Sequence, residues 1–429
     1  MDRIARVWGH YALNSRGHPT LRVVVETESG AKGYGLAPSG ASTGTREAVE
    51  KRDGGERWLG RGVSTVLALL ESEVAPRLVG MRPDRQREVD SLLVALDGTP
   101  NKSRLGANLT TATSIAVARA GAASVGVELF KHLGGAKSKL VPTPLLNIIN
   151  GGVHAGNDLS IQEFLIIPVG ADSILEALRI SVEVYWSLRA ILKDKYGPQA
   201  VNVGDEGGFA PPLRATREAL DLLVEAVRTA GYSPGSDVLL GLDAAASQFY
   251  DEKERVYSVD GKNLTAEELL EYYESLVDEY PIVYIEDPFW EDDWEMFSMI
   301  TKRLGDRVLI VGDDLYTTNV RYLRKGIDNR ATNAALVKVN QIGTVSETID
   351  FVWEAHWHGM RAIVSHRSGD TEDPFIADLS VALETGLIKT GAPARGERTS
   401  KYNRLIEIWE ILDSPKYAAS SPFSRRTVG

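Results

Sequence analysis

Six polar residues in the second half of the chain follow apolar runs, and their side chains can bind cations or transfer protons. They are Asp243, Glu286, Asp313, Lys338, His366 and Lys389. Apart from a longer first interval, each follows the previous one by about one strand-and-helix unit. In a (β/α) barrel, the carboxyl ends of the strands form the rim that carries the active site. Six such residues in register therefore predict a catalytic rim.

Lys338 stands in residues 334–341, an apolar run of strand character. A lysine held among aliphatic side chains loses solvation, so its pKa falls and it can act as a base near neutral pH. The alternative is a lysine at the end of an edge strand that points into water, which is the commoner situation for a single lysine. The other rim residues favour the first interpretation.

Three of the rim residues, Asp243, Glu286 and Asp313, are carboxylates that would converge on one site. Three carboxylates do not stay ionised together without a cation, and ligands that are all oxygen indicate magnesium. The alternative is that each acid caps the helix after its strand. One acid would be enough to cap each helix, but Glu286 is followed by Asp287 and Asp313 by Asp314. These additional acids favour the metal site. A cation next to Lys338 would lower the pKa of that lysine further, and the pair would suit removal of a proton α to a carboxylate.

Further candidates lie in loops. Glu206 stands in the glycine-rich turn 202–209 and could assist a leaving group, although an acidic surface turn has the same composition. His154 stands among glycines in residues 150–157, a segment suited to closing over a substrate, but a lone loop histidine is more often incidental. Arg367, in residues 365–369, could bind a phosphate or carboxylate with two hydrogen bonds.

The positions of turn residues divide the chain into two parts. The first part begins with three β-rich runs, expected to form an antiparallel sheet, and continues through the glycine- and hydroxyl-rich loop 38–44 into helical patterns. The strands are expected at 7–12, 21–27 and 32–37, and the helices at 63–78, 85–96 and 109–125. The segment 132–144 has the composition of a linker, so we expect an N-terminal α+β domain over residues 1–138 and a second domain over 139–429.

The second part alternates apolar runs with helical segments such as 267–280 and 344–357, which predicts parallel βα units. Residues 251–264 have the pattern of an inserted hairpin. The expected strands are 238–242, 282–285, 308–311, 334–339, 361–364 and 387–388.

Composition excludes several classes of protein. With 43% hydrophobic and 25% charged residues, the chain is expected to be globular, and 59 acidic against 48 basic residues disfavour binding to nucleic acid or to anionic membranes. The absence of cysteine excludes disulfides, thiolate metal sites and cysteine nucleophiles. No secretion signal or membrane span is expected, and we predict a cytoplasmic protein.

Taken together, the motifs resemble those of the enolase family, in the family's order and over essentially the whole chain. The matching segments are 39–44, 204–208, 285–288, 338–343, 365–369 and 389–395. The resemblance implies a modified (β/α)8 TIM-type barrel, irregular at its first strands, with an N-terminal α+β capping domain. It also implies magnesium-dependent, reversible dehydration of 2-phosphoglycerate to phosphoenolpyruvate in glycolysis and gluconeogenesis.

The resemblance also implies a role for each matching residue. Lys338 would take the C2 proton, Glu206 would be the acid that helps hydroxide leave C3, and Glu163 would be its partner. Asp243, Glu286 and Asp313 would bind the first Mg²⁺, and Ser42 a second, substrate-assisted one. The remaining substrate contacts would be the carboxylate ligand Lys389, the phosphate ligands Arg367 and Ser368, and the histidines His154 and His366.

Some positions depart from the family's usual pattern, among them Asn14, His18 and Gln248, but none has a predicted role in proton transfer. The resemblance further implies a homodimer or a ring of dimers and a secondary presence at the cell surface. Two alternatives stay open. One is another enzyme of the same superfamily, such as a racemase, cycloisomerase or acid-sugar dehydratase. The other is a non-catalytic binding protein on the same scaffold.

Overall fold

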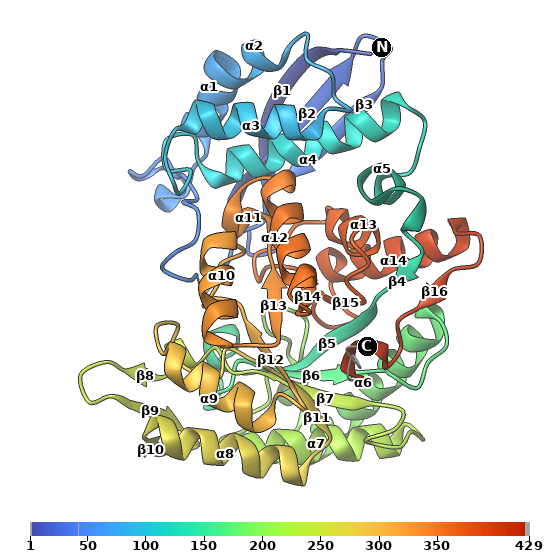
Figure 1. Cartoon of the computed structure of the whole chain (residues 1–429). Helices are drawn as coiled ribbons and strands as arrows, with labels where there is room; N and C mark the ends of the chain where they lie inside the picture. Colours follow the sequence, from blue (N-terminus) through green and yellow to red (C-terminus); the bar gives the residue numbers. More distant parts are fainter. Residues whose placement is uncertain (1, 42, 425–429) are drawn as a thin grey trace.

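A computed structural model describes residues 2–41 and 43–424 of the chain. Figure 1 shows a smaller N-terminal domain lying over one end of a barrel. The two parts meet at the carboxyl ends of the barrel strands, where Ser39 pairs with Gly369 and the backbone N–H of Ser15 donates to the carbonyl of Asp370. The fold class predicted from the sequence is therefore confirmed.

The N-terminal domain consists of an antiparallel sheet covered by helices. The sheet is antiparallel and three-stranded, as predicted, with the order β1-β2-β3, and α4 packs on β2 and β3. Glycines make this contact possible, since a Cβ atom at Gly35 would lie 2.2 Å from the carbonyl oxygen of Ala112. The elements are β1 (Ile4–Leu13), β2 (Pro19–Thr27), β3 (Lys32–Leu36), α1 (Ser64–Leu69), α2 (Ala75–Leu78), α3 (Gln86–Asp97), α4 (Ala107–Ser124) and α5 (Leu129–Gly134).

Eight strands close the barrel, and one of them runs against the others. Strand β6 is antiparallel to its two neighbours in the barrel, β5 and β7, and every other pair of neighbouring barrel strands is parallel. The first residue of β6 therefore lies at the rim where the other strands end. The strands are β5 (Thr143–Asn150), β6 (Glu163–Ile167), β7 (Leu239–Asp243), β11 (Ile282–Glu286), β12 (Leu309–Gly312), β13 (Ala334–Val337), β14 (Arg361–Ser365) and β15 (Leu387–Lys389).

Helices cover the outside of the barrel, two of them in a row between β6 and β7. A small parallel pair, β4 (Leu140–Val141) and β16 (Lys416–Tyr417), joins the start of this part of the chain to its end. The helices are α6 (Ile174–Tyr196), α7 (Thr216–Thr229), α8 (Ala266–Glu279), α9 (Trp294–Leu304), α10 (Val320–Asn329), α11 (Val339–Ile342), α12 (Val345–Trp357), α13 (Phe375–Ala382) and α14 (Gly396–Ile411).

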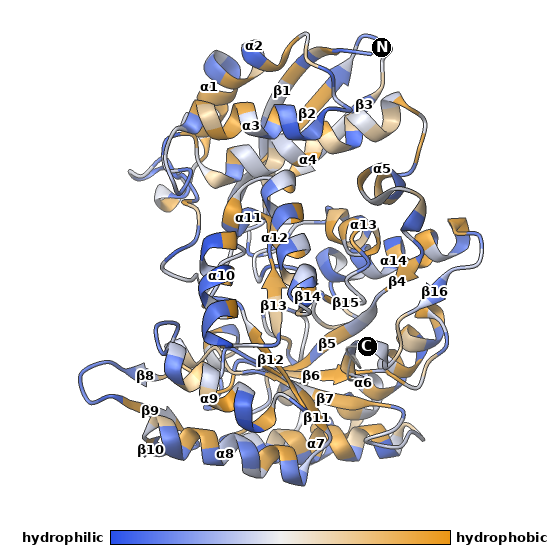
Figure 2. Cartoon of the chain, in the orientation of Figure 1, coloured by the Kyte–Doolittle hydropathy of each residue, from blue (hydrophilic) through white to orange (hydrophobic). Residues whose placement is uncertain are grey.

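The barrel interior has an apolar floor beneath a polar layer. The buried floor includes Leu145, Leu165, Tyr284, Leu336, Ile363 and Leu387, and Figure 2 shows the barrel strands to be hydrophobic. Since side chains in a strand alternate between its two faces, the residue two positions nearer the rim points inward as well. Those residues are Asn147, Glu163, Glu286, Lys338, Ser365 and Lys389. Strand geometry therefore gathers polar groups in one layer on top of the floor.

Three expectations about elements were wrong in detail. The strand expected at 334–339 ends at Val337, because the backbone N–H of Lys338 donates to Thr318 Oγ1 (2.9 Å) and the chain then turns into α11. The hairpin expected at 251–264 is a three-stranded antiparallel sheet, β8 (Tyr250–Asp251), β9 (Val256–Val259) and β10 (Lys262–Leu264). The first two barrel strands, β5 and β6, were not among those predicted.

No single helix in the described part of the chain is long and apolar enough to cross a membrane. Ala107–Ser124 and Leu129–Lys137 pass that test only as a pair, and they are bent by 96° relative to each other.

Candidate active site

The polar layer and the loops above it line one cavity at the rim of the barrel. It collects nine of the twelve predicted site residues: His154, Glu163, Glu206, Asp243, Lys338, His366, Arg367, Ser368 and Lys389. Glu286 and Asp313 lie next to it, in contact with Lys389 and Lys338 respectively. Ser42 lies outside the described residues. The register of the sheet explains the grouping, since Glu163, Asp243 and Glu286 occupy facing positions on three adjacent strands.

Lys389 lies among three carboxylates. Its Nζ atom is 2.7 Å from Asp243 Oδ2, 2.7 Å from Glu286 Oε2 and 3.1 Å from Glu163 Oε2. Burial alone would lower the pKa of Lys389, but the three acids hold it well above its usual range. Burial, and then Asp243, raise the pKa of Glu286 to about 8. The cluster thus carries more acid than its lysine can balance.

The predicted metal ligands are not helix caps in this structure. The helices that follow β11 and β12 begin at the caps Asp293 and Asn319, so Glu286 and Asp313 cap neither. The ligand set fits a hard cation, because it consists of carboxylate oxygens and because the buried Glu286 Oε1 has no hydrogen-bond partner among the described residues. The three ligand atoms do not form one tight group, since Lys389 bridges Asp243 and Glu286.

A second acidic group lies beside the first. Ligand atoms of Asp287, Asp313 and Asp314 lie within 4.8 Å of one another. Asp287 accepts hydrogen bonds from the backbone N–H groups of Asp313 (2.9 Å) and Asp314 (2.8 Å). Burial, and then Asp314, raise the pKa of Asp287 well above its usual range. Asp287 therefore ties the end of β11 to the turn that carries Asp313.

Lys338 is an inward-facing residue of a closed barrel, with a side chain that is 14% exposed, so the edge-strand alternative is excluded. Its ammonium group contacts Asp313 Oδ2, and Gln341 Nε2 donates to Asp313 Oδ1 (2.9 Å). Burial alone would lower the pKa of Lys338, but Asp313 raises it above its ordinary value. The predicted fall in this pKa is therefore wrong for the structure as it stands, because the lysine has an anionic partner.

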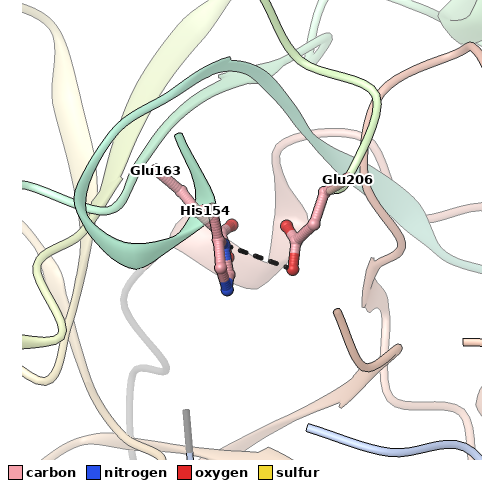
Figure 3. Close-up of side chains that lie close together, drawn as sticks. All are labelled: His154, Glu163 and Glu206. Atoms are coloured by element: carbon pink, nitrogen blue, oxygen red, sulfur yellow. Dashed lines mark ion pairs between the residues drawn. The ribbon is translucent and has the colours of Figure 1, made fainter. Parts of the chain in front are cut away.

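Across the cavity, two carboxyl groups and an imidazole lie together (Figure 3). His154 Nδ1 is 3.6 Å from Glu206 Oε1 and 3.9 Å from Glu163 Oε1. Burial, and then Glu206, raise the pKa of Glu163 well above its usual range. Burial alone would also raise the pKa of Glu206, but His366 and His154 hold it well below that range. The environments thus separate the two acids, and the pair holds a proton chiefly on Glu163.

The segment 365–369 is held by the N-terminal domain. Arg367 donates from both terminal nitrogens to Glu47 (2.9 and 3.0 Å) and also to Asn340 Oδ1 (3.0 Å). Ser368 Oγ accepts from the backbone N–H of Ala41 (2.6 Å). Ala41, in the loop 38–44, therefore reaches one of the predicted phosphate contacts.

Sequence reasoning missed four residues that hold this site. Asn147 donates to Glu206 Oε2 (3.0 Å), Glu47 binds Arg367, Gln341 binds Asp313, and Arg398 contacts His366. The alternation of inward positions in β5 could have indicated Asn147, had that strand been recognised. For the others the chain offers no signal, because each contact joins segments far apart in sequence.

Comparison with known proteins identifies the family to which the chain belongs. The family profiles "Enolase, N-terminal domain" and "Enolase, C-terminal TIM barrel domain" match residues 4–133 and 138–425. The chain belongs to the enolase family. An enolase of Aeropyrum pernix is 58% identical over 416 residues, covering 97% of this chain and 96% of the relative. Enolases of Methanocaldococcus jannaschii (57%, covering 95% of each chain) and Pyrococcus furiosus (54%, covering 96% of each) are similar as well.

These matches confirm that the chain is an enolase-family enzyme, and hence a carbon–oxygen lyase.

Proposed function

We propose that this enolase-family site converts 2-phospho-D-glycerate reversibly into phosphoenolpyruvate in glycolysis and gluconeogenesis. The observation that carries the proposal is the arrangement of one cavity. Lys338, directly after β13, faces the cavity, and the Glu163–Glu206 pair lines it from β6 and from the 202–209 turn. A base and an acid in one cavity are what a stepwise elimination of water requires.

In the first step, the neutral Lys338 amine takes the C2 proton, and the electrons of the C2–H bond pass into the substrate carboxylate to give an enediolate. In the second step the C2=C3 double bond forms as the C3–O bond breaks. The departing hydroxide takes a proton from Glu206, the acid, and leaves as water, while Glu206 is supplied by its partner Glu163, on which the pair chiefly holds that proton. Lys389 would bind the substrate carboxylate, and Arg367 and Ser368 the phosphate, with His154 and His366 at the substrate.

Asp243, Glu286 and Asp313 would hold the first Mg²⁺, with Ser42 contributing to a second that binds with substrate. When bound, the metal would supply positive charge beside the substrate carboxylate, where the negative charge of the enediolate accumulates. Asp313 would then be shared with the cation and would hold the Lys338 proton less strongly, which favours the neutral amine.

The test is formation of phosphoenolpyruvate from 2-phosphoglycerate, measured with Mg²⁺ and after chelation. Activity should require the metal, and Lys338→Ala should lower kcat by roughly 10²- to 10⁴-fold because it removes the general base. Exchange of the C2 proton with solvent should be lost in the same variant. Lys262→Ala, at an exposed lysine of β10, is the matched control and should retain full activity.

Other outcomes would refute the proposal. Full activity in Lys338→Ala would refute the assignment of the base. Wild-type protein that forms no phosphoenolpyruvate, yet exchanges the α-proton of a different acid, would be another enzyme of the superfamily. Protein that does neither would support a binding role alone.

We further propose that the chain works in the cytoplasm, with a secondary presence at the cell surface, as a homodimer or ring of dimers. Its two domains would divide at residue 138. Family resemblance supports each of these assignments, and the exposed apolar surface discussed below supports association of copies.

A further inference from the structure

Arg398, on α14, is completely buried, and no carboxylate lies within 3.4 Å of its guanidinium group in the described part of the chain. Its nearest acidic atoms are Glu397 Oε1, 3.5 Å from Nε, and Asp370 Oδ2, 4.0 Å from Nη1. Burying a charge is costly unless its hydrogen bonds are satisfied. The groups that Arg398 binds must therefore explain why a charged side chain is buried beside the catalytic cavity.

The hydrogen bonds of Arg398 converge on two catalytic turns. Nη2 donates to the carbonyl of Asp205 (3.0 Å), next to Glu206, and to the carbonyl of Ser368 (2.7 Å). Nη1 donates to the carbonyl of Arg367 (2.6 Å). One planar guanidinium group thus joins the turn that carries the acid to the turn that carries the phosphate contacts.

The fourth contact joins Arg398 Nη1 to His366 Nδ1, at 2.7 Å. Arginine carries only donors and does not lose its proton in proteins, so Nδ1 must be the acceptor. An acceptor nitrogen carries no proton, and the hydrogen of a neutral imidazole must then be on Nε2. The contact therefore determines the tautomer of His366.

The other ring nitrogen faces the acid. His366 Nε2 is buried, has no hydrogen-bond partner among the described residues, and lies 3.4 Å from Glu206 Oε2, its nearest carboxylate oxygen. The charged groups around the ring are Glu206 and Asp370, which would favour its protonation, and Arg398, which opposes it. Burial is the largest effect and, together with Arg398, lowers the pKa of His366 to about 4. A neutral ring with its hydrogen on Nε2 can only donate toward Glu206.

The backbone leaves room for this arrangement at Gly391, two residues after the end of β15. Its φ is +80°, and a Cβ atom there would lie 2.9 Å from Arg398 Cδ and 3.1 Å from His366 Cε1. Only glycine adopts this conformation readily and lets both side chains approach.

We propose that Arg398 is a positioning residue that holds His366 as the neutral Nε2–H tautomer, so that His366 donates to Glu206 and orients it for the departure of hydroxide. The tautomer assignment stands on geometry alone, whereas its role in the second step rests on the proposed function.

Nuclear magnetic resonance of ¹⁵N-labelled histidine tests the tautomer without turnover. The chain has only seven histidines, and His366→Gln assigns the signal. Wild-type protein should show an unprotonated Nδ1 and a protonated Nε2 between about pH 5 and 8. In Arg398→Met the ring should populate both tautomers and titrate nearer its ordinary pKa of about 6.5. A wild-type signal with hydrogen on Nδ1, or a doubly protonated ring, would overturn the assignment even if the variant did not fold.

Kinetics test the role in the second step. Arg398→Met should lower phosphoenolpyruvate formation roughly 10- to 100-fold, the usual effect of losing a partner that orients a functional histidine. Exchange of the C2 proton should fall far less, because the ammonium group of Lys338 pairs with Asp313. Arg398→Lys should restore part of the loss. Equal losses in exchange and dehydration would contradict the role.

The matched control is Arg404→Met, which removes a guanidinium group from the same helix. Arg404 binds Asp378 and Glu128, away from the cavity. It should lower stability without changing the His366 signal or the ratio of exchange to dehydration. If wild-type protein forms no phosphoenolpyruvate, the proposed function fails, and the tautomer result still decides the assignment.

Discussion

At the scale of single residues, the rim is organised by a shortage of positive charge. Lys389 contacts three carboxylates and Lys338 contacts one, so the two lysines do not neutralise the acids around them. The raised pKa of Glu286, about 8, follows first from burial and then from that imbalance. A carboxyl group with a raised pKa keeps its proton at neutral pH until a cation displaces it.

We therefore expect Mg²⁺ binding to release a proton from Glu286. Below about pH 8 the carboxyl group must lose its proton before it can bind the metal, so affinity should fall as pH falls, by up to about tenfold per unit. Isothermal titration calorimetry in buffers with different ionisation enthalpies measures both the affinity and the protons released. An affinity that does not change between pH 6 and 8 would contradict this expectation.

Glu286→Gln should weaken Mg²⁺ binding by at least about tenfold and should remove most of its dependence on pH. Glu295→Gln, at an exposed acid of α9, is the control and should change neither property.

At the scale of elements, the N-terminal domain completes a helix of the barrel. The backbone N–H of Ser346 donates to Asp90 Oδ2 (2.9 Å), and that of Val345 donates to Ser114 Oγ (2.9 Å). Asp90 and Ser114 belong to α3 and α4, whereas the two donors begin α12. Since α11 and α12 follow Lys338 directly, the N-terminal domain holds the segment that follows the proposed base.

Asp90→Ala should cost about 1–3 kcal/mol of stability, because it removes a cap and leaves a buried N–H group without a partner. The melting temperature from calorimetry measures the loss. Asp84→Ala, which removes a partly exposed acid paired locally with Arg82, should change the melting temperature less. Equal losses would show that the link between the domains is not stabilising.

Asp90 also predicts how stability depends on pH. Burial raises its pKa above the ordinary value despite the hydrogen bonds that it accepts. Its contribution to stability is therefore largest below the unfolded pKa and is lost as pH rises through the higher folded pKa. The melting temperature of Asp90→Asn relative to wild type should accordingly rise between about pH 4 and 7, and a constant difference would contradict this reasoning.

The barrel strands that could be predicted from the sequence are those that end at a candidate catalytic or metal-binding residue. The antiparallel strand β6 could not be predicted. Asp243, Glu286 and Lys389 end apolar runs, so alternation alone places them on one rim. Glu163 begins its strand, and only the antiparallel pairing of β6 with β5 and β7 brings it to the same rim. The pKa of Lys338 was similarly out of reach, because its direction depends on Asp313, which belongs to the preceding βα unit. Sequence patterns give inward-facing positions, but the partner of each charge comes from tertiary structure.

At the scale of the whole molecule, two helices, α6 and α12, each carry more than one exposed apolar side chain. On α6, Leu175, Val182 and Trp186 are 59%, 37% and 57% exposed. They are seven and eleven residues apart, so they lie on one face of the helix. Arg179, between them, pairs with Glu176 and Glu183. An apolar stripe with both signs of charge along it can complement a second copy of itself turned by 180°.

We expect this face of α6 to contribute to the association of copies, because a stripe of this kind is rarely left in contact with water. Trp186→Glu would put a charge into the contact and should shift the protein toward smaller species in sedimentation velocity. Trp357→Glu, at the end of α12, is a stringent control. Trp357 is even more exposed, at 86%, but Trp353 is the only other exposed large apolar side chain on this fully described helix. If the α12 variant dissociates and the α6 variant does not, the interface lies on α12. If wild-type protein is monomeric at micromolar concentration, the proposed homo-oligomer is wrong. The site would then have to work within one chain, which is possible because residues of a single chain line its cavity.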